Sequence, residues 1–279
     1  TTQIGGLSTS AVIGLTTAQL GALTTTQLGG LTATQIKVLT NSQMANLTDT
    51  QLQNLTTTQL GGLSATQLGA LTVAQFGVLT STELGALNGT QIKGITSAGI
   101  AAMSTTQLGG LSATQLAALT ATQMLALNST NVAALSTTQV GGLTTTAIGG
   151  LTSTQVGALT TTQLSALTTT QIGGLKTTAA VALTTTQFGA LDSVQVGALA
   201  TSTFAALSTS DIAALTTTQL AGVTSTQMKA LTTTQVAVLT TSQIAALTSS
   251  QLAGLSASAI TAMSTTQIGG FTADEIAAL

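Results

Sequence analysis

The sequence predicts an all-α solenoid in which short capped helices, one for each eight-residue repeat, stack on one another. Two observations support this fold class. A large apolar residue recurs at every eighth position from Leu7 to Leu279, without an insertion or a deletion. Within most repeats a hydroxyl residue is followed three places later by glutamine, a pattern that begins helices. A β-solenoid is the alternative, because the abundant threonine is β-branched and favours strands.

The repeat is labelled a to h, with the recurring leucine at a and the consensus Leu-Thr-Thr-Thr-Gln-(Leu/Ile/Val)-(Gly/Ala)-(Gly/Ala). All 35 a positions are large and apolar, and the five that are not leucine are Ile95, Met103, Val223, Met263 and Phe271. One extra residue would move every later apolar side chain off the core. The unbroken count therefore predicts one continuous array of about 35 repeats over residues 1–279.

Position b has the composition of a helix N-cap. It is Thr, Ser, Asn or Asp at 32 of its 34 occurrences, and the exceptions are Lys176 and Ala200. The side chains of these four residue types accept a hydrogen bond from a backbone amide in the first turn of a helix. Asn88, Asn128 and Asp192 are good caps but poor strand residues, so these substitutions favour the helical interpretation.

Positions e and f complete the signal for a helix start. Position e is Gln or Glu at 27 of 35 occurrences, and its side chain is expected to reach back to the amide at b and form a capping box. Position f is a sizeable apolar residue everywhere except Ala180, which gives a and f the spacing of a hydrophobic staple. The last unit, Thr272 to Leu279 with Glu275 at e, has every feature of a helix start.

Positions g and h are small in most repeats. Lys37, Lys93 and Lys229 occur at g, which indicates that g reaches solvent, whereas Gly, Ala, Val and Asn at h indicate crowding. In a straight strand a and f would lie on opposite faces, because they are five residues apart. Only a bend at g and h in every repeat would rescue the β-solenoid.

The repeat length excludes one continuous helix. Eight residues at about 100° each advance about 80° beyond two full turns, so the a and f stripe would wind around the axis. We expect a helix of about one and a half turns in each repeat and a change of direction at a and b. Helices this short are unstable alone, so the repeats must stack. No period of sixteen or twenty-four residues appears at f, g or h, which leaves the number of repeats per turn open.

The composition provides few groups for chemistry. Only 4% of residues are charged, and His, Cys, Pro, Trp and Tyr are absent. The carboxylates are dispersed and are expected to be solvated or to act as caps: Asp49, Glu83, Asp192, Asp211, Asp274 and Glu275. Without a histidine or a tuned carboxylate pair, general acid–base catalysis lacks its groups, and a calcium site lacks clustered ligands. We therefore predict no catalytic residues, no metal site, no cofactor and no enzyme activity.

The same composition limits the partners. Four scattered lysines cannot neutralise a polyanion, so no nucleic-acid partner is predicted. No apolar run reaches the roughly 18 residues that a membrane span needs. The five methionines and four phenylalanines occupy a or f and are expected in the core. Positions b to e are expected to display hydroxyls and amides with almost no charge, a surface that promotes association with further copies.

The repeats resemble the Leu-Thr-x-Thr-Gln-Ile-x-Ala octapeptide arrays of very large secreted or surface-attached bacterial repeat proteins, which are adhesin-like. The resemblance covers the whole chain and implies an extracellular or cell-surface stalk, fibre or matrix role, with no functional residues to carry over. The chain begins at Thr1 without Met and ends at the core position of Leu279, so we expect a processed product or a piece of a longer array.

Two functions follow as hypotheses. The first is a structural filament or stalk whose main partner is a further copy of itself, with polysaccharide or a cell surface as other partners. The second is a binding surface for ice or polysaccharide, because the regular threonine rows resemble ice-binding repeat arrays in spacing and residue type.

Overall fold

The computed structural model describes residues 2–273 and 276. Within this part of the chain the regular elements are α-helices of four to six residues, one to each repeat, and no strand occurs. The all-α prediction is therefore confirmed, and the β-solenoid alternative is wrong. The predicted last helix start includes Asp274 and Glu275, which lie outside the described residues, as do Thr1 and Leu279.

The chain divides into two compact units, residues 1–143 and 144–279. The first unit contains α1 (Thr2–Gly5), α2 (Thr9–Ile13), α3 (Thr17–Gly21), α4 (Thr25–Leu28), α5 (Ala33–Lys37), α6 (Asn41–Ala45), α7 (Asp49–Gln53), α8 (Thr57–Gly61), α9 (Ala65–Gly69), α10 (Val73–Val78), α11 (Ser81–Gly85), α12 (Gly89–Gly94), α13 (Ser97–Ala101), α14 (Thr105–Gly109), α15 (Ala113–Ala117), α16 (Ala121–Ala126), α17 (Ser129–Ala134) and α18 (Thr137–Gly141). The second unit contains α19 (Thr145–Gly150), α20 (Ser153–Gly157), α21 (Thr161–Ser165), α22 (Thr169–Gly173), α23 (Thr177–Ala180), α24 (Thr185–Gly189), α25 (Ser193–Ala198), α26 (Thr201–Ala205), α27 (Thr209–Ala214), α28 (Thr217–Ala221), α29 (Ser225–Lys229), α30 (Thr233–Ala237), α31 (Thr241–Ile244), α32 (Ser249–Leu252), α33 (Ala257–Thr261) and α34 (Thr265–Ile268).

The helices begin as the capping-box pattern predicts. Thr56, the N-cap of α8, has extended backbone angles (φ −71°, ψ 157°), and its hydroxyl accepts a hydrogen bond from the Gln59 amide at 3.2 Å. Gln59 Oε1 in turn accepts from the Thr56 amide at 2.8 Å. The same reciprocal pair begins most of the helices, whereas α23 and α26, which follow Lys176 and Ala200, have no side-chain cap. The extended b residue is therefore the point at which each repeat changes direction.

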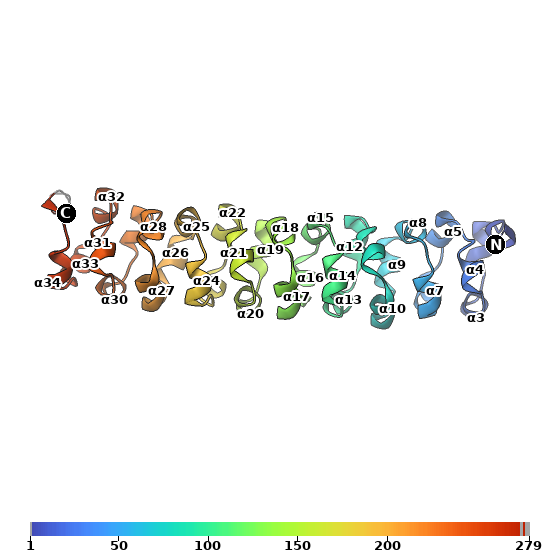
Figure 1. The fold of residues 1–279 in the computed structure, drawn as a ribbon. Coiled ribbons are helices and arrows are strands. Elements are labelled where there is room, and N and C mark those ends of the chain that lie inside the picture. The colour runs from blue at the N-terminus through green and yellow to red at the C-terminus, as the bar shows by residue number, and fades with distance from the viewer. Residues whose placement is uncertain (1, 274–275, 277–279) are drawn as a thin grey trace. The chain divides into compact units, whose positions relative to one another are not determined.

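Each unit is a solenoid in which the helices pack on those three places further along the chain. In the first unit α9 packs against α12 and α12 against α15, and in the second α22 packs against α25 and α25 against α28. Figure 1 shows these helices following one another along the axis of each unit. A turn of the solenoid therefore contains at least three repeats, a number that the local sequence pattern left open.

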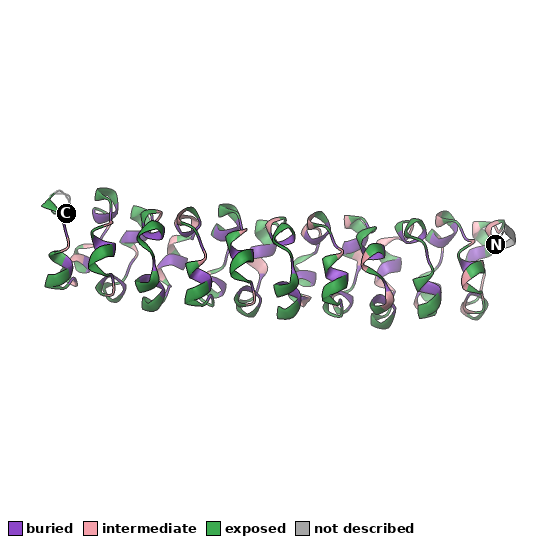
Figure 2. Ribbon diagram, viewed as in Figure 1, coloured by how far each residue is buried: buried purple, intermediate pink, exposed green. Residues whose placement is uncertain are grey.

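The a and f side chains form the core of each unit. They are buried along most of each unit, although Ile268 near the end of the chain is 38% exposed; Figure 2 shows buried and exposed segments alternating along the ribbon. The methionines and phenylalanines at a and f are also buried, among them Met44, Met228, Phe76 and Phe204. Their predicted place in the core is confirmed.

The glycines at h allow close approach between turns and are not needed for unusual backbone angles. No described residue has a positive φ, and Gly62, the C-cap of α8, has right-handed helical angles (φ −78°, ψ −16°). A Cβ added to Gly62 would lie 2.9 Å from the carbonyl oxygen of Ala33, and one added to Gly254 would lie 2.5 Å from that of Ser225. Both distances are too short for a real Cβ, so the crowding predicted at h is confirmed at these glycines.

Candidate functional site

The glutamine at e joins successive turns of the solenoid. Gln91 in α12 uses its Oε1 in the capping box, where it accepts from the Asn88 amide at 2.9 Å. Its Nε2 donates to the carbonyl oxygens of Leu60 at 2.9 Å and Leu63 at 2.8 Å, and more weakly to that of Gly61 at 3.3 Å. Leu60 and Gly61 end α8, and Leu63 precedes α9. One side chain therefore caps the start of its own helix and the end of a helix four places earlier.

This second role repeats in both units. Gln59 reaches the carbonyl of Leu31, and Gln227 reaches those of Val196 and Leu199. The carbonyl acceptors lie 28 to 31 residues before the glutamine, so each amide sits over the junction between the repeats three and four places earlier. A helix this short leaves most of its last carbonyls without partners inside the helix. The glutamine amide supplies a donor to them.

The position of these glutamines corrects one prediction. Residues at b to e were expected to display their polar groups, but the glutamines at e are almost all buried, and Gln91 and Gln227 are 2% and 1% exposed. Of these four positions, b, c and d are displayed: Thr56, Thr57 and Thr58 are exposed while Gln59 is buried. The capping pattern indicated one role for the amide oxygen but contained no signal for the amide nitrogen.

Two shorter residues at e, Thr203 and Asp211, make different contacts, whereas Asn131 keeps the bond to the carbonyl 28 residues earlier. The hydroxyl of Thr203 lies 3.0 Å from that of Thr177, and Asp211 accepts from the hydroxyl of Thr185 at 3.1 Å. In both pairs a c-position threonine three repeats earlier reaches the short side chain. These polar groups therefore hold neighbouring turns together.

The carboxylates that the structure describes have structural places, as predicted for solvated or capping residues. Glu83 and Asp211 occupy e, are buried, and accept from the backbone amide and hydroxyl of the preceding cap residue. Asp192 is the N-cap of α25, and Asp49 lies exposed in the first turn of α7. No group of three or more possible metal ligands occurs among residues 2–273 and 276. In the same part of the chain no helix is long and apolar enough to cross a membrane.

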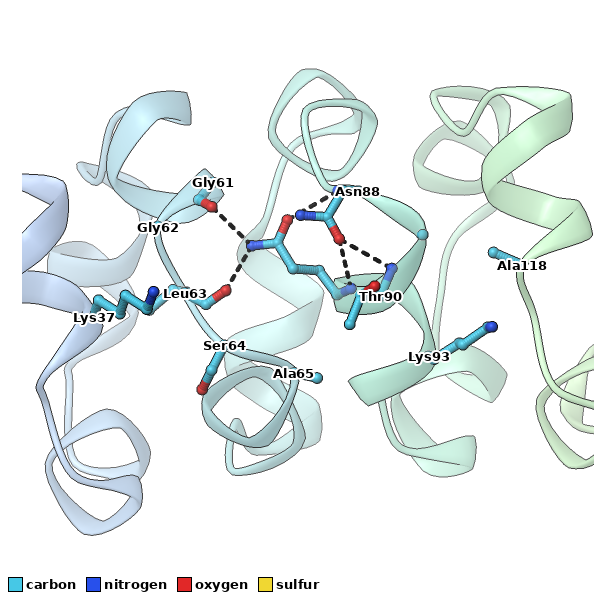
Figure 3. A pocket seen from close by; sticks show the side chains of 12 residues that line it. Lys37, Gly61, Gly62, Leu63, Ser64, Ala65, Asn88, Thr90, Lys93 and Ala118 are labelled. Carbon is cyan, nitrogen blue, oxygen red and sulfur yellow. Dashed lines mark hydrogen bonds between the residues drawn. The ribbon is translucent and has the colours of Figure 1, made fainter.

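A hollow on the first unit brings two lysines to one surface. Its volume is about 730 Å³, and we call it the lysine hollow; it is lined by Lys37, Gly61, Gly62, Leu63, Ser64, Ala65, Asn88, Gly89, Thr90, Gln91, Lys93 and Ala118. Figure 3 shows Lys37 at one end of the lining and Lys93 and Ala118 at the other, with Asn88 and Thr90 between them. Its lining contains no carboxylate. The hollow therefore crosses several turns of the solenoid and has a positive charge at each end.

Sequence reasoning treated the lysines as scattered and missed this juxtaposition. Lys37 and Lys93 both occupy g but lie seven repeats apart, and only the winding of the solenoid places them beside the same hollow. Asn88 at b and Gly89 at c also depart from the consensus. The sequence did show that both lysines occupy g. That fact predicts their proximity only when the number of repeats per turn is known.

Comparison with known proteins identifies the repeat. A family model described as the ALTTAQ repeat matches residues 15–49, 92–129, 100–137, 132–169, 148–177, 188–225, 204–241, 224–257 and 244–279. These overlapping matches cover well over half of the chain, and each is about four or five octapeptides long. No curated protein matches the chain.

Proposed function

Because the chain belongs to the ALTTAQ repeat family, a family of tandem repeats, we propose that this structural repeat protein forms an extracellular filament, stalk or matrix fibre by stacking of its octapeptides. The observation that carries the proposal is the use of each repeat's polar chemistry. The cap hydroxyl and the glutamine amide oxygen form hydrogen bonds within the repeat, and the glutamine amide nitrogen donates to a neighbouring turn. In a solenoid of this kind, each repeat is stabilised by contacts with its neighbours, and the stacked repeats form an extended surface.

The proposal includes the absence of enzyme activity and a location outside the cell or on its surface. It is supported by the structural places of the described carboxylates and by the absence of His and Cys from the sequence. A nucleophilic hydroxyl needs a neighbouring base, and Glu83 and Asp211 are instead committed to backbone caps. The proposed location is based on the resemblance of the repeats to secreted and surface-attached arrays.

Self-association is supported by the exposed surface. The side chains at b, c and d are mostly threonine and serine, and the net charge of the whole chain is −2. Copies of such a surface repel one another weakly. We expect the purified chain to form filaments or lateral bundles when it is concentrated.

Negative-stain electron microscopy and analytical ultracentrifugation of the purified chain test the proposal. Filaments or concentration-dependent bundles are expected. Monodisperse particles of single-chain mass at all concentrations would contradict self-assembly. Surface labelling of intact producing cells with an antibody against the chain tests the location, and labelling that requires permeabilised cells would contradict an extracellular role.

The exposed hydroxyl rows support a second candidate, a binding surface for ice or polysaccharide. Thr56, Thr57 and Thr58 illustrate the pattern, with three adjacent exposed hydroxyl side chains in one repeat. A thermal hysteresis assay and a panel of immobilised polysaccharides test this candidate. Failure in both assays would remove it without affecting the filament proposal.

A further inference from the structure

We propose that the lysine hollow binds a short segment of an acidic polysaccharide, with carboxylate or sulfate groups at Lys37 and Lys93 and sugar hydroxyls at the polar groups between them. This inference does not depend on self-assembly. The first argument is charge. Lys37 and Lys93 are the only lysines among residues 1–143, both side chains are exposed, and both line the same hollow, whose lining contains no carboxylate.

The second argument is the shape of the hollow. Gly61, Gly62 and Gly89 contribute no side chains to the lining, and Gly89 stands at c, where most repeats carry threonine, serine or alanine. The lining residues belong to, or directly flank, α5, α8, α9, α12 and α15, so they follow the axis of the unit across several turns. Such a lining fits an extended chain lying along the axis better than a compact small molecule.

The third argument is the kind of polar groups between the lysines. Asn88 directs its Oδ1 to the amides of Thr90 and Gln91 at 3.0 Å each, so the amide nitrogen of this exposed side chain remains to face a ligand. The Thr90 side chain is exposed and the Ser64 side chain partly exposed beside it. Amides and hydroxyls of this kind exchange hydrogen bonds with sugar hydroxyls.

The fourth argument concerns the source of affinity in the hollow. The chain contains no Trp or Tyr, and its phenylalanines occupy core positions, so no aromatic face is available for stacking on a sugar ring. With Lys37 and Lys93 in the lining, charge and hydrogen bonds are therefore the expected source of affinity. Interactions between exposed charges weaken as salt increases, because the screening length falls to about 10 Å at 0.1 M ionic strength. Binding is therefore expected to decrease as salt is added.

The test is calorimetric titration of the full chain with a short oligogalacturonate at low salt. The carboxyl-reduced, neutral form of the same oligosaccharide is the first control. We expect binding of the acidic form alone, and a weakening of about tenfold in the Lys37→Ala/Lys93→Ala double variant. The Lys37→Arg/Lys93→Arg variant keeps both charges and is expected to bind within about threefold of the parent. Lys176→Ala removes an exposed lysine of the second unit and is expected to leave binding unchanged.

A second pair of variants tests the hollow without changing charge. A Cβ added at Gly61 or at Gly109 meets no atom within 4 Å, so both sites accept a larger side chain, but only Gly61 lines the lysine hollow. Gly61→Leu is expected to abolish binding, and Gly109→Leu to preserve it, with the same helical circular dichroism in both.

Three outcomes would overturn the proposal. Equal binding of the neutral oligosaccharide would show that charge does not direct recognition. An equal loss in Lys176→Ala, or an equal effect of Gly61→Leu and Gly109→Leu, would show that the hollow is not the site. Equal binding of a single-stranded DNA oligomer, with the same dependence on Lys37 and Lys93, would show a general polyanion surface and not a saccharide site.

Discussion

Replacing Gln227 with glutamate tests whether the glutamine amide nitrogen holds the turns together. Gln227 is 1% exposed, and its Oε1 accepts from the Thr224 amide at 2.8 Å. Its Nε2 donates to the carbonyl oxygens of Val196 at 3.1 Å and Leu199 at 2.8 Å. Glutamate keeps the shape and the cap acceptor, but it places an oxygen where the two carbonyls require a donor. The change therefore isolates the bonds between turns from the capping box.

The expected cost follows from the number of bonds lost. A net hydrogen bond contributes about 0.5–1.5 kcal/mol, and leaving a buried acceptor without a partner costs about 1–3 kcal/mol. The Leu199 carbonyl loses its donor, whereas the Val196 carbonyl loses one bond and keeps the Leu199 amide at 3.2 Å, so we expect the local free energy of opening to fall by about 2–4 kcal/mol. Since about 1.4 kcal/mol corresponds to a factor of ten, amide hydrogen exchange around the site should accelerate by about thirtyfold or more.

Hydrogen exchange is the appropriate assay because a repeat array opens locally and has no single unfolding free energy. The amides of α25 and α29 should show the acceleration, since the bonds join these regions. Thr226→Ala, at an exposed d position of the same repeat, is the matched control. Exchange in Gln227→Glu within about threefold of that control would refute the role assigned to the amide nitrogen.

Three further predictions concern other positions of the repeat. Glu83→Gln supplies the amide nitrogen that other glutamines at e donate to the carbonyl 28 residues earlier, here expected to be that of Leu55, and should slow local exchange by about tenfold; unchanged exchange would contradict this. Lys176→Thr adds an N-cap to α23, which has none, and should stabilise that turn by about 0.5–2 kcal/mol; exchange of the α23 amides measures it, and faster exchange would refute it. Gly222→Ala forces a methyl group into the backbone of a neighbouring turn and should lower the melting temperature, whereas Gly109→Ala meets open space and should raise or preserve it. Equal shifts in thermal melts of these two variants would show that the close approach at h is unimportant.

The pattern within eight residues was sufficient to predict the helices. A cap residue at b, glutamine at e and an apolar residue at f act on backbone groups no more than a few positions away, so their spacing in the sequence is their spacing in space. Among the helices whose N-cap residue the structure describes, the two without a side-chain cap follow Lys176 and Ala200, the two exceptions visible in the sequence. The glutamine at e did not reveal its burial, because the same residue type is compatible with a buried or an exposed side chain.

The sequence contained one indication of the number of repeats per turn, which lies in pairs of residues at different positions of the repeat. Glycines at h often face alanine or serine at c, 29 residues earlier, as in Gly62 with Ala33 and Gly254 with Ser225. A search for a longer period at a single position, such as h alone, does not find this pairing, because the two partners occupy positions h and c.

By itself, the sequence determined that the chain would form short capped helices around a core of a and f side chains. Only the tertiary structure decided how many repeats separate stacked helices, which carbonyls the glutamine amide meets, and that Lys37 and Lys93 share one hollow. The physical reason is distance along the chain. Capping bonds span three residues and are encoded locally, whereas the bonds between turns span 28 to 31 residues and depend on the angle accumulated over three to four repeats.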